Sequence, residues 1–68
     1  MYSALIKKYE AEKAEAKAIL NVYFNNPAGI GEHPDLIEEM DKLLGKLGEA
    51  EDKIETLKNN FDENGQAK

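Results

Sequence analysis

The chain has 68 residues, no cysteine, one histidine and a formal net charge of −5. A chain this short is near the lower size limit for an independent hydrophobic core, and without disulfides or a cluster of metal ligands we expect it to gain stability by association. Nine lysines against fourteen acids disfavour binding to nucleic acid and to anionic lipid, and no apolar run approaches the roughly 18 residues of a membrane span.

The first predicted element is a helix over 3–25. Ser3 is a suitable N-cap, and the sequence Asn25-Asn26-Pro27 ends the helix because proline disfavours a helical conformation in the residue before it. At 100° per residue one narrow arc of this helix is apolar, with Ile6 and Phe24 at its edge. The arc contains Tyr2, Leu5, Tyr9, Ala16, Ile19, Leu20 and Tyr23.

The second element is a loop over 26–33. One proline and two glycines in Pro27-Ala28-Gly29-Ile30-Gly31 break any helical period, and the loop is longer than a tight helical hairpin requires. His33 is the expected N-cap of the helix that follows, and Pro34 suits its first turn, where no amide hydrogen is needed. The candidate site residues of this loop and its exit are Asn26, Pro27, Gly29, Gly31, His33 and Pro34.

The third element is a helix over 34–62, followed by a frayed tail at 66–68. Its apolar residues repeat at spacings of four and three without a missed step, which is the heptad pattern of helices that pack along a narrow stripe. We call this stripe the heptad seam. It contains Leu36, Met40, Leu43, Leu47, Ala50, Ile54, Leu57 and Phe61.

Two helices of similar length predict one all-α domain over 1–65, an antiparallel hairpin. A register in which the numbers of facing residues add to about 59 places Leu20 opposite Met40 and Ala16 opposite Leu43. Glu12 falls inside the apolar arc, and we predict that it leans outward to Lys8 or Lys46.

Two features of the sequence are not explained by a two-helix hairpin. Several large apolar residues lie beside the seam or near the loop, and we predict that they form a protein interface: Phe24, Ile30, Ile37, Met40 and Leu44. Gly45 and Gly48 stand inside the second helix, where each costs about 1 kcal/mol relative to alanine. Either they are tolerated defects or a neighbouring backbone passes close to them.

The sequence offers little for chemistry. Nucleophilic catalysis has no cysteine and a single serine to use, and the lone histidine lacks a second ligand for a metal. A carboxylate-bridged bundle site needs a glutamate followed three residues later by a histidine, and the chain has no such pair. We therefore expect no enzyme activity, no catalytic residues, no cofactor and no metal.

The segment from Tyr23 to Asp35, together with Ala50 to Lys53, resembles small uncharacterised proteins encoded by marine tailed phages, cyanophages among them. That resemblance implies an accessory protein of a virus in a bacterial cytoplasm and assigns no activity. The absence of cysteine is compatible with the same reducing compartment.

The sequence thus predicts a non-catalytic helical interaction or assembly module, with the hairpin pairing into a four-helix bundle and a dimer favoured over larger oligomers. Another protein is a further expected class of partner. Two alternatives stay open: a nucleic-acid-binding hairpin dimer, which needs a continuous lysine face, and an acidic inhibitor of a host enzyme, which uses the ten acids of 35–63.

Overall fold

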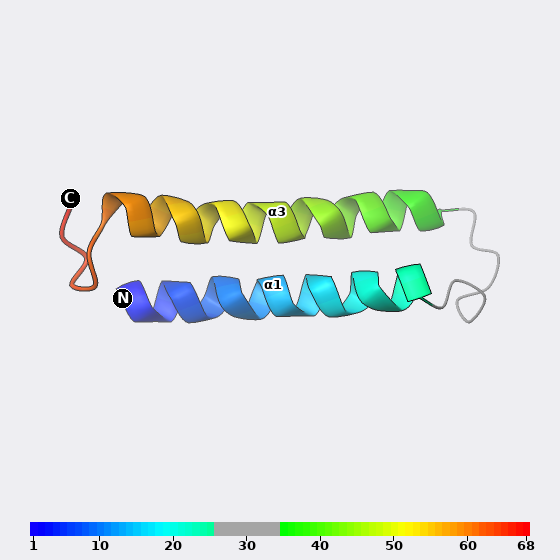
Figure 1. The fold of residues 1–68 in the computed structure, drawn as a ribbon, viewed down its shortest axis with the longest axis horizontal. Helices are drawn as coiled ribbons and strands as arrows, with labels where there is room; N and C mark the ends of the chain where they lie inside the picture. Colours follow the sequence, from blue (N-terminus) through cyan, green and yellow to red (C-terminus); the bar gives the residue numbers. More distant parts are fainter. Residues whose placement is uncertain (26–34) are drawn as a thin grey trace.

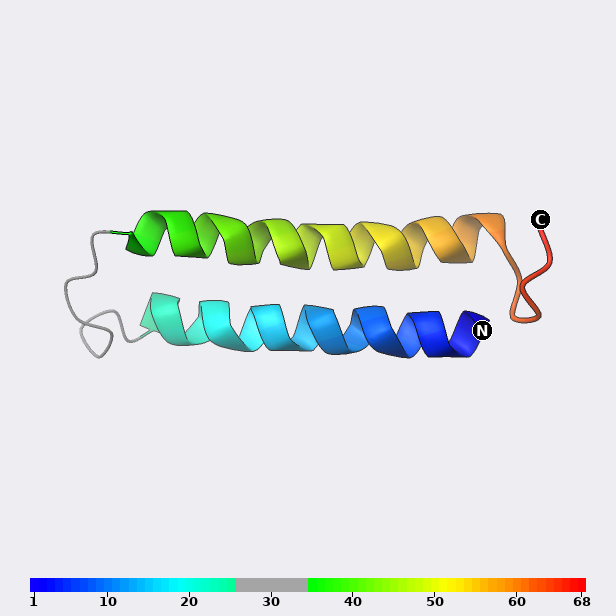
Figure 2. The same cartoon turned by 180° about the vertical axis from the view of Figure 1, so that it is seen from behind.

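In the computed structural model the protein is a hairpin of two long helices, described for residues 1–25 and 35–68. Helix α1 spans Tyr2–Asn25 and helix α3 spans Leu36–Asn60. The helices lie side by side in opposite directions, so the N-terminus is close to the last turn of α3 (Figures 1 and 2). Both described segments are free of strands apart from one isolated bridge, which confirms the all-α hairpin. Neither helix is long and apolar enough to cross a bilayer.

The helix boundaries differ from the predicted ones by one or two residues. Helix α1 starts one residue early and ends at Asn25, as predicted, with the Asn25 side chain donating to the carbonyl oxygen of Asn21 at 2.8 Å. Helix α3 starts at Leu36 instead of residue 34, with Asp35 at the N-cap. It ends two residues early because Phe61 is extended, at φ −137° and ψ 152°. The predicted loop of 26–33 lies outside the described residues.

The C-terminal tail is not frayed, which corrects the prediction for 66–68. One Asp62 carboxylate oxygen accepts hydrogen bonds from the backbone amides of Asn64 and Gln66, each at 2.9 Å. Gly65 adopts a positive φ of 78°, which lets the chain reverse, and the amide of Lys68 donates to the carbonyl oxygen of Asn60 at 2.9 Å. An aspartate that caps a turn three residues before a glycine is a signal that the sequence analysis passed over.

The heptad seam of α3 packs on α1 as predicted. Every seam residue from Leu36 to Leu57 is buried or half-buried, and Ala50 and Ile54 are the most enclosed. On α1 the enclosed residues follow the same spacing of four and three, which the predicted arc did not resolve. They are Tyr2, Ile6, Tyr9, Lys13, Ala16, Leu20 and Tyr23, with Ile19 half-buried beside this spacing.

This α1 stripe differs from the predicted arc at two positions. Ile6 is half-buried while Leu5 is 37% exposed, and Lys13 takes the place next to the seam that the predicted arc gave to Glu12. Glu12 leans outward and pairs with Lys8 at 3.4 Å, which confirms the prediction for that carboxylate. A lysine tolerates this position better than a glutamate because its longer stem can lie along the partner helix while its ammonium reaches water.

The register of the two helices is about one turn away from the predicted one. The side chains that meet across the seam are Tyr23 with Glu39, Lys13 with Glu51 and Tyr9 with Lys53. Their residue numbers add to 62, 64 and 62, whereas the predicted register required 59. The shift brings the last seam residue, Phe61, beside Tyr2, with which it lines one hollow. In the predicted register Phe61 would have extended past the start of α1 with no partner.

Candidate interaction surfaces

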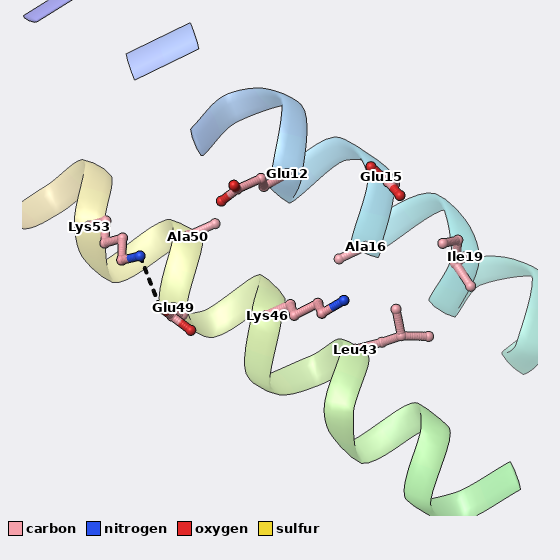
Figure 3. A pocket seen from close by; sticks show the side chains of 9 residues that line it. All are labelled: Glu12, Glu15, Ala16, Ile19, Leu43, Lys46, Glu49, Ala50 and Lys53. Carbon is pink, nitrogen blue, oxygen red and sulfur yellow. Dashed lines mark ion pairs between the residues drawn. The ribbon is translucent and has the colours of Figure 1, made fainter. Parts of the chain in front are cut away.

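The hairpin has two long sides, and each carries a groove between the helices. The first, which we call the charged groove, has carboxylates along both walls and lysines along the α3 wall (Figure 3). It is lined by Glu12, Glu15, Ala16, Ile19, Leu43, Lys46, Glu49, Ala50 and Lys53. The second, the apolar groove, is lined by Ala14, Lys17, Ala18, Leu20, Asn21, Phe24, Leu44 and Leu47.

Part of the charge in the charged groove is paired within the chain. Lys53 and Glu49, one turn apart on α3, form an ion pair of 2.9 Å, as residues four positions apart on a helix can. The hydrogen bond and the charge of Lys53 lower the pKa of Glu49, and Glu49 raises the pKa of Lys53 in return. The same ammonium lies 5.5 Å from the centre of the Tyr9 ring on α1, a distance suited to a cation–π contact. The groove therefore helps to hold the two helices together.

One hydrogen bond joins the two helices at the end of the hairpin nearest Asn25. The Tyr23 hydroxyl of α1 donates to a Glu39 carboxylate oxygen of α3 at 3.0 Å. Accepting this bond, the carboxylate raises the pKa of Tyr23 above its ordinary value of 10.0. The predicted register missed this contact, because the one-turn shift is what brings Glu39 to Tyr23.

A metal or ligand site needs clustered donor side chains or buried polar atoms without a partner. Within residues 1–25 and 35–68 no three acidic or histidine side chains come together in a way that could hold a metal ion. Across the same residues every buried side-chain nitrogen or oxygen has a hydrogen-bond partner, so none is left pointing into a cavity for a ligand.

The apolar groove is the opposite case, since its large side chains remain uncovered. Phe24 at one end of α1 is 68% exposed, and Leu44 on α3 is 57% exposed. Ile37 lies seven residues before Leu44, two turns away on the same face of α3, and is 77% exposed. Exposed apolar side chains that gather on one side of a small protein mark an interaction surface.

The predicted interface residues are thus only partly brought together. Phe24, Ile37 and Leu44 share the apolar side, whereas Met40 is half-buried in the seam between α1 and α3. Ile30 and the loop residues Asn26, Pro27, Gly29, Gly31, His33 and Pro34 lie outside the described residues.

Small residues complete the apolar side. Ala14 and Ala18 form part of the α1 wall. On α3, Gly48 lies on this side and Gly45 lies on the outer face, and a Cβ atom added to either would meet nothing within 4 Å. Nothing inside the hairpin therefore requires a glycine at either position.

The apolar side ends where charges begin. Lys13, one turn before Lys17 on α1, pairs with Glu51, one turn after Leu47 on α3, at 3.8 Å. From this bridge toward the N-terminus the same strip of α1 carries Glu10 and Lys7, and the same strip of α3 continues with Glu55. On this side of the hairpin, the exposed side chains of Phe24, Ile37 and Leu44 thus all lie in the half nearest Asn25 and Asp35.

Comparison with known proteins adds no identity: no family model, no curated protein and no solved structure matches the chain.

Proposed function

We propose that the chain is a non-catalytic helical interaction module that works by packing the apolar side of its hairpin on another helical surface. The observation that carries the proposal is the contrast between a complete seam and an uncovered side. The hairpin already fills its seam with Ala16, Leu20, Ala50 and Ile54, yet Phe24 and Leu44 stay largely exposed beside it. Each exposed apolar side chain gains about 1.5–3 kcal/mol when a partner buries it fully.

Assembly into a four-helix bundle is the simplest way to cover such a side. A hairpin of this size buries few residues and is close to the stability limit of a monomer. Pairing of two hairpins would add a second layer of helices and enclose the apolar groove. The charged groove and the acidic outer face of α3 would remain available to solvent or to another protein.

The segment from Tyr23 to Asp35 resembles small proteins of tailed phages, and this resemblance extends the proposal to the cell in which the module would work. An accessory protein of a tailed phage in a bacterial cytoplasm would suit a small module without cysteine. Its task there would be to assemble, or to bind a protein of the phage or of the host.

Two measurements test the proposed function. Sedimentation equilibrium at micromolar concentration measures self-association, and the immobilised chain is tested for capture of another protein. The informative variant is Leu44→Lys, and the matched control is Val22→Lys, because Val22 is 52% exposed and does not line the apolar groove. We expect the wild type and the control to self-associate or capture a protein, and Leu44→Lys to lose that binding while its helical circular dichroism persists. A wild-type chain that stays a folded monomer and captures nothing would overturn the proposal.

A further inference from the structure

We propose that the occupant of the apolar groove is a second copy of this chain, placed so that α1 of each copy packs along α3 of the other and the Asn25 ends of both hairpins lie together. This inference rests on the proposed function and specifies the partner and the geometry of the bundle. The two-fold axis of the proposed dimer runs parallel to the helices.

The exposed apolar side chains fit a partner with long helices. Phe24 on α1 is 68% exposed, and Ile37 and Leu44, two turns apart on α3, are 77% and 57% exposed. A stable interface of standard size takes roughly 800 Å² from each partner. A short peptide would cover only part of this side, whereas a second hairpin lies along both helices at once.

Charge decides which helices face each other. Two hairpins joined through the same side can be related by a two-fold axis along the helices, which places α1 on α3 of the other copy, or by one across the helices, which places α1 on α1 and α3 on α3. Helix α1 carries four lysines and three glutamates, a net charge of +1, and α3 carries seven acids and four lysines, a net charge of −3. The axis across the helices would bring two helices of charge −3 together, whereas the axis along them pairs opposite signs.

The same arrangement gives the small residues a role. In the register of the hairpin, Ala14 of one copy comes level with Gly48 of the other, and Phe24 comes level with Ile37. An alanine facing a glycine lets two helix backbones approach closely, which accounts for a glycine with empty space around its Cβ position inside the hairpin. Beyond the apolar half, Lys7 of one copy comes level with Glu55 of the other, so opposite charges continue the contact.

Spin labels on two single-cysteine variants separate the two arrangements, because the natural chain has no cysteine. Ala4→Cys and Val22→Cys place the label at exposed α1 positions that do not line the apolar groove. With the axis along the helices, the distance between the two labels of a dimer is the same for both variants. With the axis across them, centred near Ile19, the labels are offset along the bundle by about 45 Å for Ala4→Cys and only about 9 Å for Val22→Cys.

We expect pulsed dipolar measurements on dimeric protein to give equal distances for the two variants. A distance about 20 Å longer for Ala4→Cys would overturn the proposed geometry and leave the proposed function standing. A chain that stays monomeric at hundreds of micromolar, yet captures another protein through Leu44, would overturn the second copy as occupant and again leave the proposed function intact.

Gly48→Ala, with Gly45→Ala as its matched control, gives a second test. Both variants add the same methyl group in open space on α3, but Gly45 lies on the face of α3 that points away from the seam and the apolar side. We expect Gly48→Ala to raise the dimer dissociation constant by about tenfold, as overpacking of a close contact does, and Gly45→Ala to leave it unchanged. Equal dissociation constants for the two variants would overturn the close approach at Gly48.

Discussion

The two sides of the hairpin are built from the same two helices beside the same seam, yet they end in opposite conditions. On the charged side, Lys53 pairs with Glu49 and lies over Tyr9, so these charges find partners inside one chain. On the apolar side, Phe24 and Leu44 contribute large surfaces that the chain itself does not cover. The seam therefore accounts for the fold, whereas the proposed function rests on the apolar side that the hairpin leaves uncovered.

The charged side and the apolar side can be compared in this way only if the seam between the helices holds both of them in place. Ile54→Ala tests whether it does. Ile54 is among the few buried side chains of the hairpin, so its truncation should lower the free energy of unfolding by about 2–4 kcal/mol. Urea denaturation followed by circular dichroism measures the change, with Val22→Ala as the exposed control, for which we expect less than about 0.5 kcal/mol. If the two substitutions cost the same, the seam is not the core of the protein.

Leu44→Ala sharpens the contrast between the two sides, because its effect should depend on protein concentration. In a monomer the 57% exposed side chain contributes little, whereas in an assembly its burial contributes about 1–2 kcal/mol. We expect the melting temperature of the wild type to rise between about 5 and about 500 μM, as binding to the folded state requires. The rise should be much smaller for Leu44→Ala, and an equal rise in both proteins would move the interface away from the apolar side.

The heptad spacing from Leu36 to Phe61 was sufficient to predict α3, its buried face and the hairpin. It did not determine the register. The α1 sequence offers Leu5 or Ile6, and Glu12 or Lys13, as neighbours of the seam, and periodicity alone does not separate residues one position apart. The choice depends on tertiary contacts, chiefly the pairing of Phe61 with Tyr2 at the far end and of Tyr23 with Glu39 near the loop.

The candidate site divides in the same way. Exposure of Ile37 and Leu44 followed from their positions beside the seam, since a two-helix hairpin cannot cover a wide apolar band. The part played by Ala14 and Ala18 did not follow, because the side of α1 on which they lie depends on the rotation of that helix about its axis. A one-residue error in the α1 stripe turns the helix by about 100° and reassigns its faces.

Gly45→Ala sharpens the comparison from the outer face of α3, which belongs to neither side. The added methyl group meets nothing within 4 Å, so the variant should gain the difference in helix propensity, up to about 1 kcal/mol. The gain should be the same in dilute and in concentrated protein, measured by urea denaturation at both concentrations. A loss of stability on concentration would show that a second chain also packs on this outer face.

The smallest expected effect is a loss of stability at alkaline pH, and it comes from the hydrogen bond at the Asn25 end. Because Glu39 raises the pKa of Tyr23 in the folded chain, the contribution of this bond is fully present below pH 10.0, the ordinary tyrosine value, and is lost as pH rises through the raised pKa. Denaturation midpoints of the wild type and of Tyr23→Phe should therefore differ near pH 8 and converge above pH 10.

Tyr2→Phe is the control, since it leaves the bond between Tyr23 and Glu39 in place. The difference between its midpoint and that of the wild type should not close over the same range. If the difference for Tyr23→Phe is as large at pH 11 as at pH 8, the phenol contributes through packing in the seam and the bond to Glu39 does not hold the helices together.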